Sequence, residues 1–158
     1  MRETPTGAAV MFNRLRIACL IFATLLTSAA GAEQFETFGD YTVHYSAFTT
    51  DFLSVDIAKS YGITRSKNRA LLNISILKKV LGTTGTPVHA RVNVTATNLH
   101  AQVRELNVRE LAEPGAVYYL AELPVSHGET LTFNVEVTPG DDKTPYNFSF
   151  QQQFVTKY

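Results

Sequence analysis

The chain has 158 residues, a formal net charge of zero, 45% hydrophobic residues and one cysteine. Charged residues make up 18% of it, a balance that excludes a disordered tail and a strongly basic nucleic-acid-binding protein. At roughly 100–200 residues per domain, this length predicts a single folded domain and little else.

Residues 1–32 have the parts of a secretory signal peptide. Two arginines precede an apolar region of ten residues, 17–26, which is too short to span a membrane. Small residues follow, and an Ala-x-Ala pattern predicts cleavage after Ala32, with Ala30 as an alternative. The residues before Met11 add nothing to the apolar region, so Met11 is an alternative initiator to the first methionine.

The only cysteine, Cys19, lies inside this apolar region. The mature domain, residues 33–158, therefore contains no thiol, which excludes disulfides, thiolate metal sites and a cysteine nucleophile. The signal also carries three of the fourteen basic residues and one of the fourteen acidic residues, which leaves the mature domain with a net charge of −2. We therefore expect an exported, slightly acidic domain that depends on its hydrophobic core.

Apolar and polar residues alternate along much of the mature domain. The alternation is clearest in the segments 41–46, 72–76, 88–95, 131–137 and 147–151. A period of two predicts antiparallel strands with one buried and one exposed face. Residues 116–121 are apolar on both faces, which predicts a central strand covered on both sides, and residues 103–111 change phase, which predicts a bulge or an edge strand.

Glycine, proline and polar residues separate these segments. Residues 82–87 predict a hairpin-length loop, and residues 54–61 are the one helical candidate, which Ser54 can cap and Gly62 can end. We expect an all-β fold, an immunoglobulin-like antiparallel β-sandwich of about seven strands with one short helical crossover between the sheets. Residues 150–154 predict a final strand whose aromatic ends point inward.

The sequence offers little catalytic chemistry. His44 and His89 lie on the polar side of their strands, while His100 and His127 lie in turns, without the spacing of a metal site. No hydrolase, metalloprotease, P-loop or dinucleotide-binding motif occurs. We therefore expect no enzyme activity, no metal and no cofactor.

Three Asn-x-Ser/Thr triplets begin at Asn73, Asn93 and Asn147. Each lies on the polar side of a strand, which indicates an exposed sheet face and explains them without glycosylation.

A basic segment precedes the strand that begins near Ala70. Arg65, Lys67 and Arg69 alternate there, close to Tyr61. In an extended chain these three side chains form a cationic row that could bind a carboxylate, a phosphate group or an acidic partner. The alternative is that the row neutralises nearby aspartates or protects a sheet edge.

The Tyr-Gly-Ile-Thr-Arg-Ser-Lys sequence at 61–67, with residues 52–53, 70–75 and 150–154, resembles a family of exported proteobacterial proteins described as a domain of unknown function. The resemblance covers nearly all of the mature domain. It implies a Gram-negative origin and a periplasmic location, and it brings no catalytic residue with it.

These observations favour a periplasmic binding or accessory module that recognises a protein or an envelope component through a sheet face or edge. A carrier of a small ligand, with an aromatic pocket between the sheets, is the second possibility, and an enzyme is the third. We expect no nucleic-acid partner and no membrane span after signal removal. An internal apolar cavity would favour the carrier, whereas a filled core with an unpaired edge strand would favour the binding module.

Overall fold

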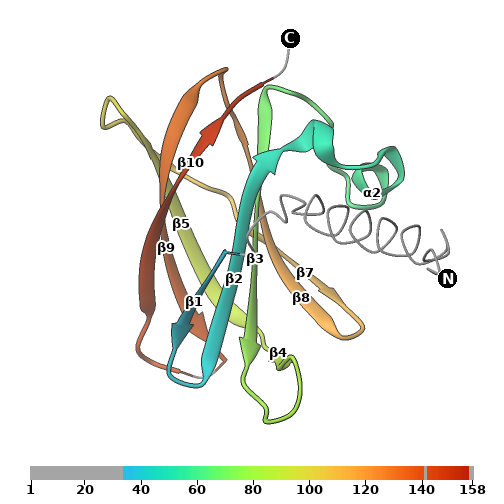
Figure 1. Cartoon of the computed structure of the whole chain (residues 1–158), viewed down its shortest axis with the longest axis vertical. Helices are drawn as coiled ribbons and strands as arrows, with labels where there is room; N and C mark the ends of the chain where they lie inside the picture. The colour runs from blue at the N-terminus through green and yellow to red at the C-terminus, as the bar shows by residue number, and fades with distance from the viewer. Residues whose placement is uncertain (1–33, 141, 157–158) are drawn as a thin grey trace, which may run out of the picture. The chain divides into compact units, whose positions relative to one another are not determined.

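Residues 34–140 and 142–156 are described by a computed structural model, and they form two antiparallel β-sheets packed face to face (Figure 1). The expected all-β antiparallel sandwich is thereby confirmed. The predicted signal peptide and its cleavage site lie outside the described residues.

One sheet has six strands in the order β1-β2-β3-β8-β7, with β4 also paired to β3. Its strands are β1 (Gln34–Phe38), β2 (Tyr41–Thr49), β3 (Arg69–Lys78), β4 (Thr86–Pro87), β7 (Arg109–Glu113) and β8 (Ala116–Pro124). The other sheet has four strands in the order β10-β9-β5-β6. Its strands are β5 (Ala90–Asn98), β6 (Val103–Glu105), β9 (Glu129–Pro139) and β10 (Tyr146–Phe154). The described residues thus contain ten strands rather than about seven.

The strand expected at 103–111 is in fact two short strands in different sheets. β6 pairs with β5, and β7 pairs with β8. The phase changes because the chain crosses from one sheet to the other, so the predicted bulge is wrong. The alternative of an edge strand is right for both, since each ends its sheet.

A short helical segment joins β2 to β3. It consists of a 3₁₀ turn, η1 (Thr50–Phe52), and the helix α2 (Val55–Ser60). The Ser54 Oγ accepts a hydrogen bond from the Ile57 amide at 3.2 Å, and Gly62 follows the helix at φ +64°, as the sequence predicted. However, β2 and β3 are neighbours in one sheet, so α2 is not a crossover between the sheets.

The loop at 82–87 returns the chain onto β3. Pro87 lies opposite Leu77 in the short β3–β4 pair, after which the chain crosses to β5 in the other sheet. Gly85 has φ +103°, and a Cβ there would lie 2.9 Å from the Lys78 carbonyl oxygen, so only glycine fits this turn without strain. The hairpin therefore joins β3 to β4 and not to the next long strand.

Apolar side chains fill the space between the sheets. The largest of those that are almost completely buried are Val43, Leu72, Ile74, Ile76, Leu131, Phe133 and Val137. Phe154, at the end of β10, is also buried in this core, as predicted for the final strand.

Aromatic rings close the side of the sandwich where β10 faces β1 and β2. The ring centroids of Tyr45 and Phe150 lie 4.5 Å apart, those of Tyr45 and Phe148 4.9 Å apart, and Phe38 stacks on Tyr146 at 5.0 Å. The rings pack against one another here, as aromatic side chains in cores generally do. They do not line the aromatic pocket that was expected of a carrier.

Candidate binding site beneath the α2 segment

Residues 50–68, which we call the α2 segment, lie on the outer side of the six-stranded sheet (Figure 1). The part of the sheet that they cover is apolar. Because side chains alternate along a strand, Leu71 of β3 and Leu120 of β8 point away from the main core. They are buried with Ala58 and Ile63 of the α2 segment. This second cluster confirms that β8 is covered on both faces.

Beside this cluster lies a hollow of about 280 Å³, which we call the α2 pocket. Three aromatic rings and several aliphatic side chains dominate its wall. The lining residues are Phe48, Leu53, Ile57, Tyr61, Ile63, Leu71, Asn73, Leu111, Glu113, Tyr118 and Leu120.

Asn73 is a polar residue in the wall of this apolar pocket. It lies between Ser46 of β2 and Leu120 of β8 in the sheet register. Its side-chain Oδ1 is buried and has no hydrogen-bond partner. An unpaired buried carbonyl costs about 1–3 kcal/mol of stability. A ligand that donates a hydrogen bond to this atom would recover part of that cost, once the side chain turns the buried oxygen toward the pocket.

The edge strand β7 holds one wall of the pocket in place. The Tyr61 hydroxyl donates to Glu113 Oε1 at 2.7 Å, and Arg109 Nη2 donates to the main-chain oxygen of Tyr61 at 2.7 Å. The hydrogen bond to Glu113, with smaller effects of burial and of the Glu113 charge, raises the pKa of Tyr61 above its ordinary value of 10.0. The tyrosine therefore remains a neutral donor, and it forms part of the pocket wall.

A buried hydroxyl fixes the rest of the α2 segment. The Thr50 side chain is fully buried, accepts a hydrogen bond from the Ser66 amide at 2.8 Å and donates to the Thr64 carbonyl at 2.8 Å. The amide of Ile63 bonds to the Ala58 carbonyl at 2.8 Å. These contacts give most positions of the Tyr-Gly-Ile-Thr-Arg-Ser-Lys sequence a structural role.

The predicted cationic row is not a single extended row, because the chain turns at Lys67 and Asn68. Arg65 Nη2 donates to the main-chain oxygen of Asp51 at 2.9 Å. Arg69 Nη2 lies 3.4 Å from Glu122 Oε2.

Of the four predicted binding residues, the structure therefore places only Tyr61 in the pocket wall. Arg65 and Arg69 make structural contacts instead, and Lys67 is exposed. Arg65 does lie beside an aspartate, as the alternative proposed, but it bonds to the main chain and not to the carboxylate. A binding role for these three cations remains a prediction.

Sequence reasoning missed Asn73, Glu113 and Arg109. Asn73 was assigned to an exposed face, but its side-chain oxygen is buried under the α2 segment. The apolar residues on the same face of the sheet, Leu71 and Leu120, were the available signal that this face is covered.

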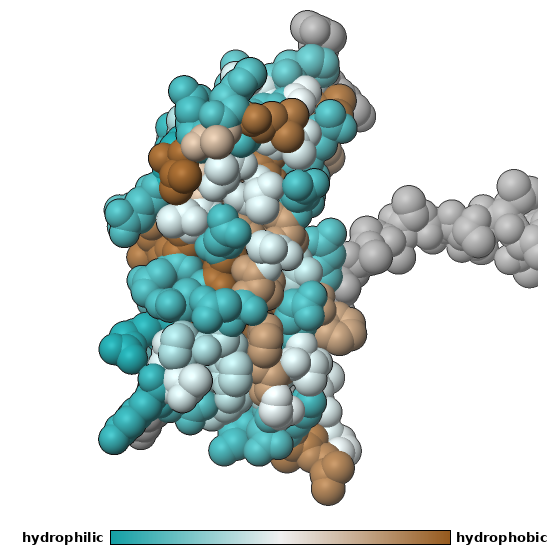
Figure 2. Space-filling model, turned by 90° about the vertical axis from the view of Figure 1, so that its left-hand side faces the viewer, coloured by the Kyte–Doolittle hydropathy of each residue, from teal (hydrophilic) through white to brown (hydrophobic). Residues whose placement is uncertain are grey.

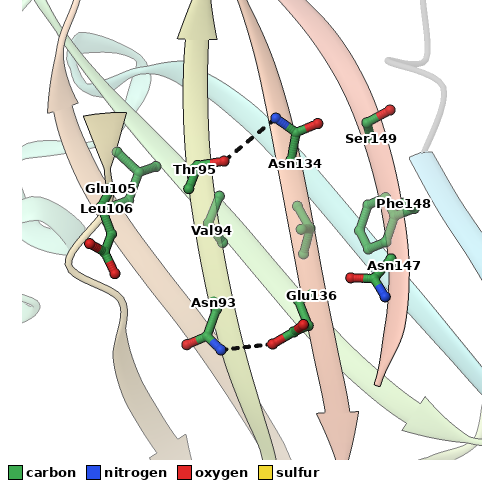
Figure 3. Close-up of a pocket in the computed structure, with 11 residues that line it drawn as sticks. Asn93, Val94, Thr95, Glu105, Leu106, Asn134, Glu136, Asn147, Phe148 and Ser149 are labelled. Carbon is green, nitrogen blue, oxygen red and sulfur yellow. Dashed lines mark hydrogen bonds between the residues drawn. The ribbon is translucent and has the colours of Figure 1, made fainter. Parts of the chain in front are cut away.

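A second hollow, of about 500 Å³, lies on the outer face of the four-stranded sheet (Figure 3). Asn93 Nδ2 donates to Glu136 Oε1 there at 2.9 Å. The exposed position of Asn93 and Asn147 fits the expectation of a polar face. Figure 2 shows this side of the molecule, on which hydrophilic and neutral residues cover most of the surface.

The fold and the two hollows define a class of protein, an antiparallel β-sandwich with a hollow on the outer face of each sheet. The chain belongs to the family described as Domain of unknown function (DUF4426), whose model matches residues 35–157. The resemblance to a domain of unknown function is thereby confirmed. No curated protein sequence matches the chain.

Solved structures share this fold. A DUF4426 family protein from Pseudomonas aeruginosa is 34% identical, with a TM-score of 0.68 over 82% of this chain and 99% of that one. FetP of uropathogenic Escherichia coli, expressed recombinantly in the periplasm, is 12% identical, with a TM-score of 0.56 over 80% of this chain and 96% of that one. A copper-bound variant of FetP is also 12% identical, with a TM-score of 0.55 over 80% and 97% of the two chains. At this identity the likeness to FetP shows the fold alone.

The histidines, aspartates and glutamates of the described residues do not gather in any group of three or more that could hold a metal ion. Neither helical turn in the described part of the chain is long or apolar enough to cross a membrane.

Proposed function

We propose that this protein is a periplasmic binding module, without catalytic activity, that recognises a partner protein by enclosing one of its apolar side chains in the α2 pocket. The observation that carries the proposal is the buried, unpartnered Asn73 Oδ1 in an otherwise largely apolar wall. Buried polar atoms are normally paired, so an exception in a pocket suggests a partner that supplies the donor.

The size of the pocket favours a side chain over a whole carried molecule. Its volume of about 280 Å³ falls just below the range of about 300–1,000 Å³ that holds drug-sized ligands. A tryptophan or tyrosine side chain combines an apolar ring with one hydrogen-bond donor, and these residues often anchor protein interfaces. A carrier with a pocket between the sheets has less support, because apolar and aromatic side chains fill that space.

Exposed apolar residues of the α2 segment, one of which lines the pocket, also suit a protein partner. Phe52, Val55 and Ile57 of the α2 segment are 73%, 61% and 44% exposed. Arg65 and Lys67, also exposed, belong to the same segment and would attract an acidic partner. Protein interfaces typically combine apolar and charged residues, and the α2 segment exposes both kinds.

The signal-peptide features of residues 1–32 support the periplasmic location. We also propose a Gram-negative origin, on the resemblance to exported proteobacterial proteins.

Two small probes of similar shape test the pocket. Phenol carries a hydroxyl group where toluene carries a methyl group. Their binding to the mature domain can be followed by amide chemical shifts in NMR spectra. We expect both to shift the amides of Leu71 and Leu120, and phenol to bind about 2–10-fold more tightly, since one hydrogen bond contributes about 0.5–1.5 kcal/mol.

The Asn73→Leu variant should lose this preference for phenol while still binding toluene. The matched control is Asn93→Leu, which changes an exposed asparagine on the other sheet and should leave both affinities unchanged. The proposal fails if neither probe shifts the pocket amides, or if Asn73→Leu keeps the full preference for phenol.

A further inference from the structure

Six polar residues form two rows across the outer face of the four-stranded sheet, and we call them the polar grid. One row contains Asn93, Glu136 and Asn147, which lie opposite one another on β5, β9 and β10. The other row contains Thr95, Asn134 and Ser149 on the same strands. Neighbouring strands lie about 4.8 Å apart, so each row presents three closely spaced polar groups within the 500 Å³ hollow (Figure 3).

Much of the hydrogen-bonding capacity of the grid is unused. Asn93 bonds to Glu136, and the contact from Asn134 Nδ2 to Thr95 Oγ1, at 3.5 Å, is long for a hydrogen bond. Among the described residues, the side chains of Asn147 and Ser149 make no hydrogen bond. The grid therefore offers amide and hydroxyl groups that can donate and accept, together with a carboxylate that accepts.

The composition of the hollow excludes several kinds of ligand. The polar side chains that line it include two carboxylates, those of Glu105 and Glu136, and no lysine or arginine, so phosphate groups and nucleic acids are disfavoured. Of its four apolar lining residues, Val94 and Val135 are buried in the core, and Leu106 and Phe148 are partly buried against it. The hollow therefore exposes more polar than apolar surface, unlike the apolar centre that is typical of a protein or lipid site.

We infer that the polar grid is a second binding site, for an uncharged or cationic oligosaccharide. Sugar hydroxyls donate and accept hydrogen bonds, as amides and hydroxyls do, and the carboxylates favour a neutral or amino sugar over an acidic one. A chain of sugar rings laid across the strands meets a polar side chain on each of β5, β9 and β10. This site differs from the α2 pocket in its sheet and in its chemistry.

Three tetrasaccharides test the inference by amide chemical shifts of the mature domain. They are the neutral tetramer of N-acetylglucosamine, its cationic deacetylated form and the acidic tetramer of galacturonate. We expect the neutral or the cationic tetramer to shift the amides of β5, β9 and β10 at millimolar concentration, and the acidic tetramer to leave them unchanged.

Variants in the grid separate direct contact from a general surface effect. Asn134→Ala and Asn147→Ala should each weaken binding about 2–10-fold, the loss expected for one hydrogen bond. Ser75→Ala, which lies on the outer face of the other sheet, is the matched control and should have no effect. Circular dichroism of each variant establishes that it is folded.

The inference is overturned if no tetramer shifts the grid amides, if the acidic tetramer binds as well as the others, or if both grid variants bind like the unchanged protein. Each of these results leaves the proposal for the α2 pocket intact, because phenol and toluene report on the opposite sheet.

Discussion

At the scale of single residues, Tyr119 connects the two sheets. The Ala90 amide, at the start of β5, donates to the Tyr119 hydroxyl at 2.6 Å, and that hydroxyl donates to Glu110 Oε2 at 2.8 Å. His89 Nδ1 lies 2.9 Å from the other oxygen of Glu110. Tyr119 itself is buried in the main core, so its hydroxyl is a polar group that the fold has paired on both sides.

Removing that hydroxyl should destabilise the protein. We expect Tyr119→Phe to lower the free energy of unfolding by about 1–2 kcal/mol, because the amide of the half-buried Ala90 loses its hydrogen-bond partner. Urea denaturation should show a lower midpoint with an unchanged slope. Tyr118→Phe is the control, since no hydrogen bond of its hydroxyl occurs among the described residues. An equal loss in both variants would contradict this account.

The same tyrosine makes stability depend on pH in the alkaline range. Burial, together with the hydrogen bond and charge of Glu110, raises the pKa of Tyr119 to about 12 from its ordinary value of 10.0, against a smaller lowering by the Ala90 amide. A raised folded-state pKa contributes stability that is fully present below the unfolded value and is lost as pH rises through the folded value.

The difference in unfolding free energy between the unchanged protein and Tyr119→Phe should therefore shrink between pH 10 and about 12. Urea denaturation at a series of pH values measures it. A difference that stays constant over this range would show that Tyr119 titrates alike in the folded and unfolded states.

At the scale of elements, the α2 segment depends on a few tertiary contacts. α2 has only six residues, fewer than an isolated helix needs to be stable in water. Its ordered conformation comes from the second apolar cluster, which includes Ile63, from the hydrogen bond of Tyr61 to Glu113 of β7 and from the hydrogen bonds of the buried Thr50 hydroxyl. We therefore expect the segment to open locally before the sheets unfold.

Replacing Thr50 by valine tests this expectation. Thr50→Val keeps the shape but leaves the Ser66 amide and the Thr64 carbonyl without their partner, so the segment should lose about 1–3 kcal/mol of local stability. Hydrogen exchange at the Ile63 amide should become roughly 5–150-fold faster, because a loss of about 1–3 kcal/mol raises the population of the open state by that factor. Thr49→Val is the matched control, since Thr49 is also buried and its side chain makes no hydrogen bond among the described residues. Equal acceleration by both substitutions would contradict the role given to Thr50.

At the scale of the whole molecule, the sequence predicts different roles for the two parts of the chain. The first 32 residues hold the only cysteine and a short apolar region, whereas the described residues form the sandwich. A domain without thiols cannot use disulfides, so its stability rests on the core between the sheets and on the second cluster under the α2 segment.

Export should therefore yield a protein that begins at Glu33. Expressed in a Gram-negative host, the chain should be recovered from the periplasm with the intact mass of residues 33–158, because signal peptidase cuts after the Ala-x-Ala pattern. A mass that begins at Gly31 would identify the alternative site at Ala30. Retention of the first methionine or of Met11 would contradict the signal-peptide assignment.

The sequence by itself determined the all-β class, most of the long strands and the short helix capped by Ser54. It also determined that the aromatic residues at the ends of 150–154 point inward. These features are local, because alternation along a strand and a hydroxyl before a helix act between near neighbours in the chain. Only the tertiary structure decided that 103–111 crosses between the sheets, that the aromatic rings pack together, and that the oxygen of Asn73 lies under the α2 segment. Periodicity reveals which face of a strand is apolar, but it does not reveal which distant element covers that face, and this is why the α2 pocket could not be predicted.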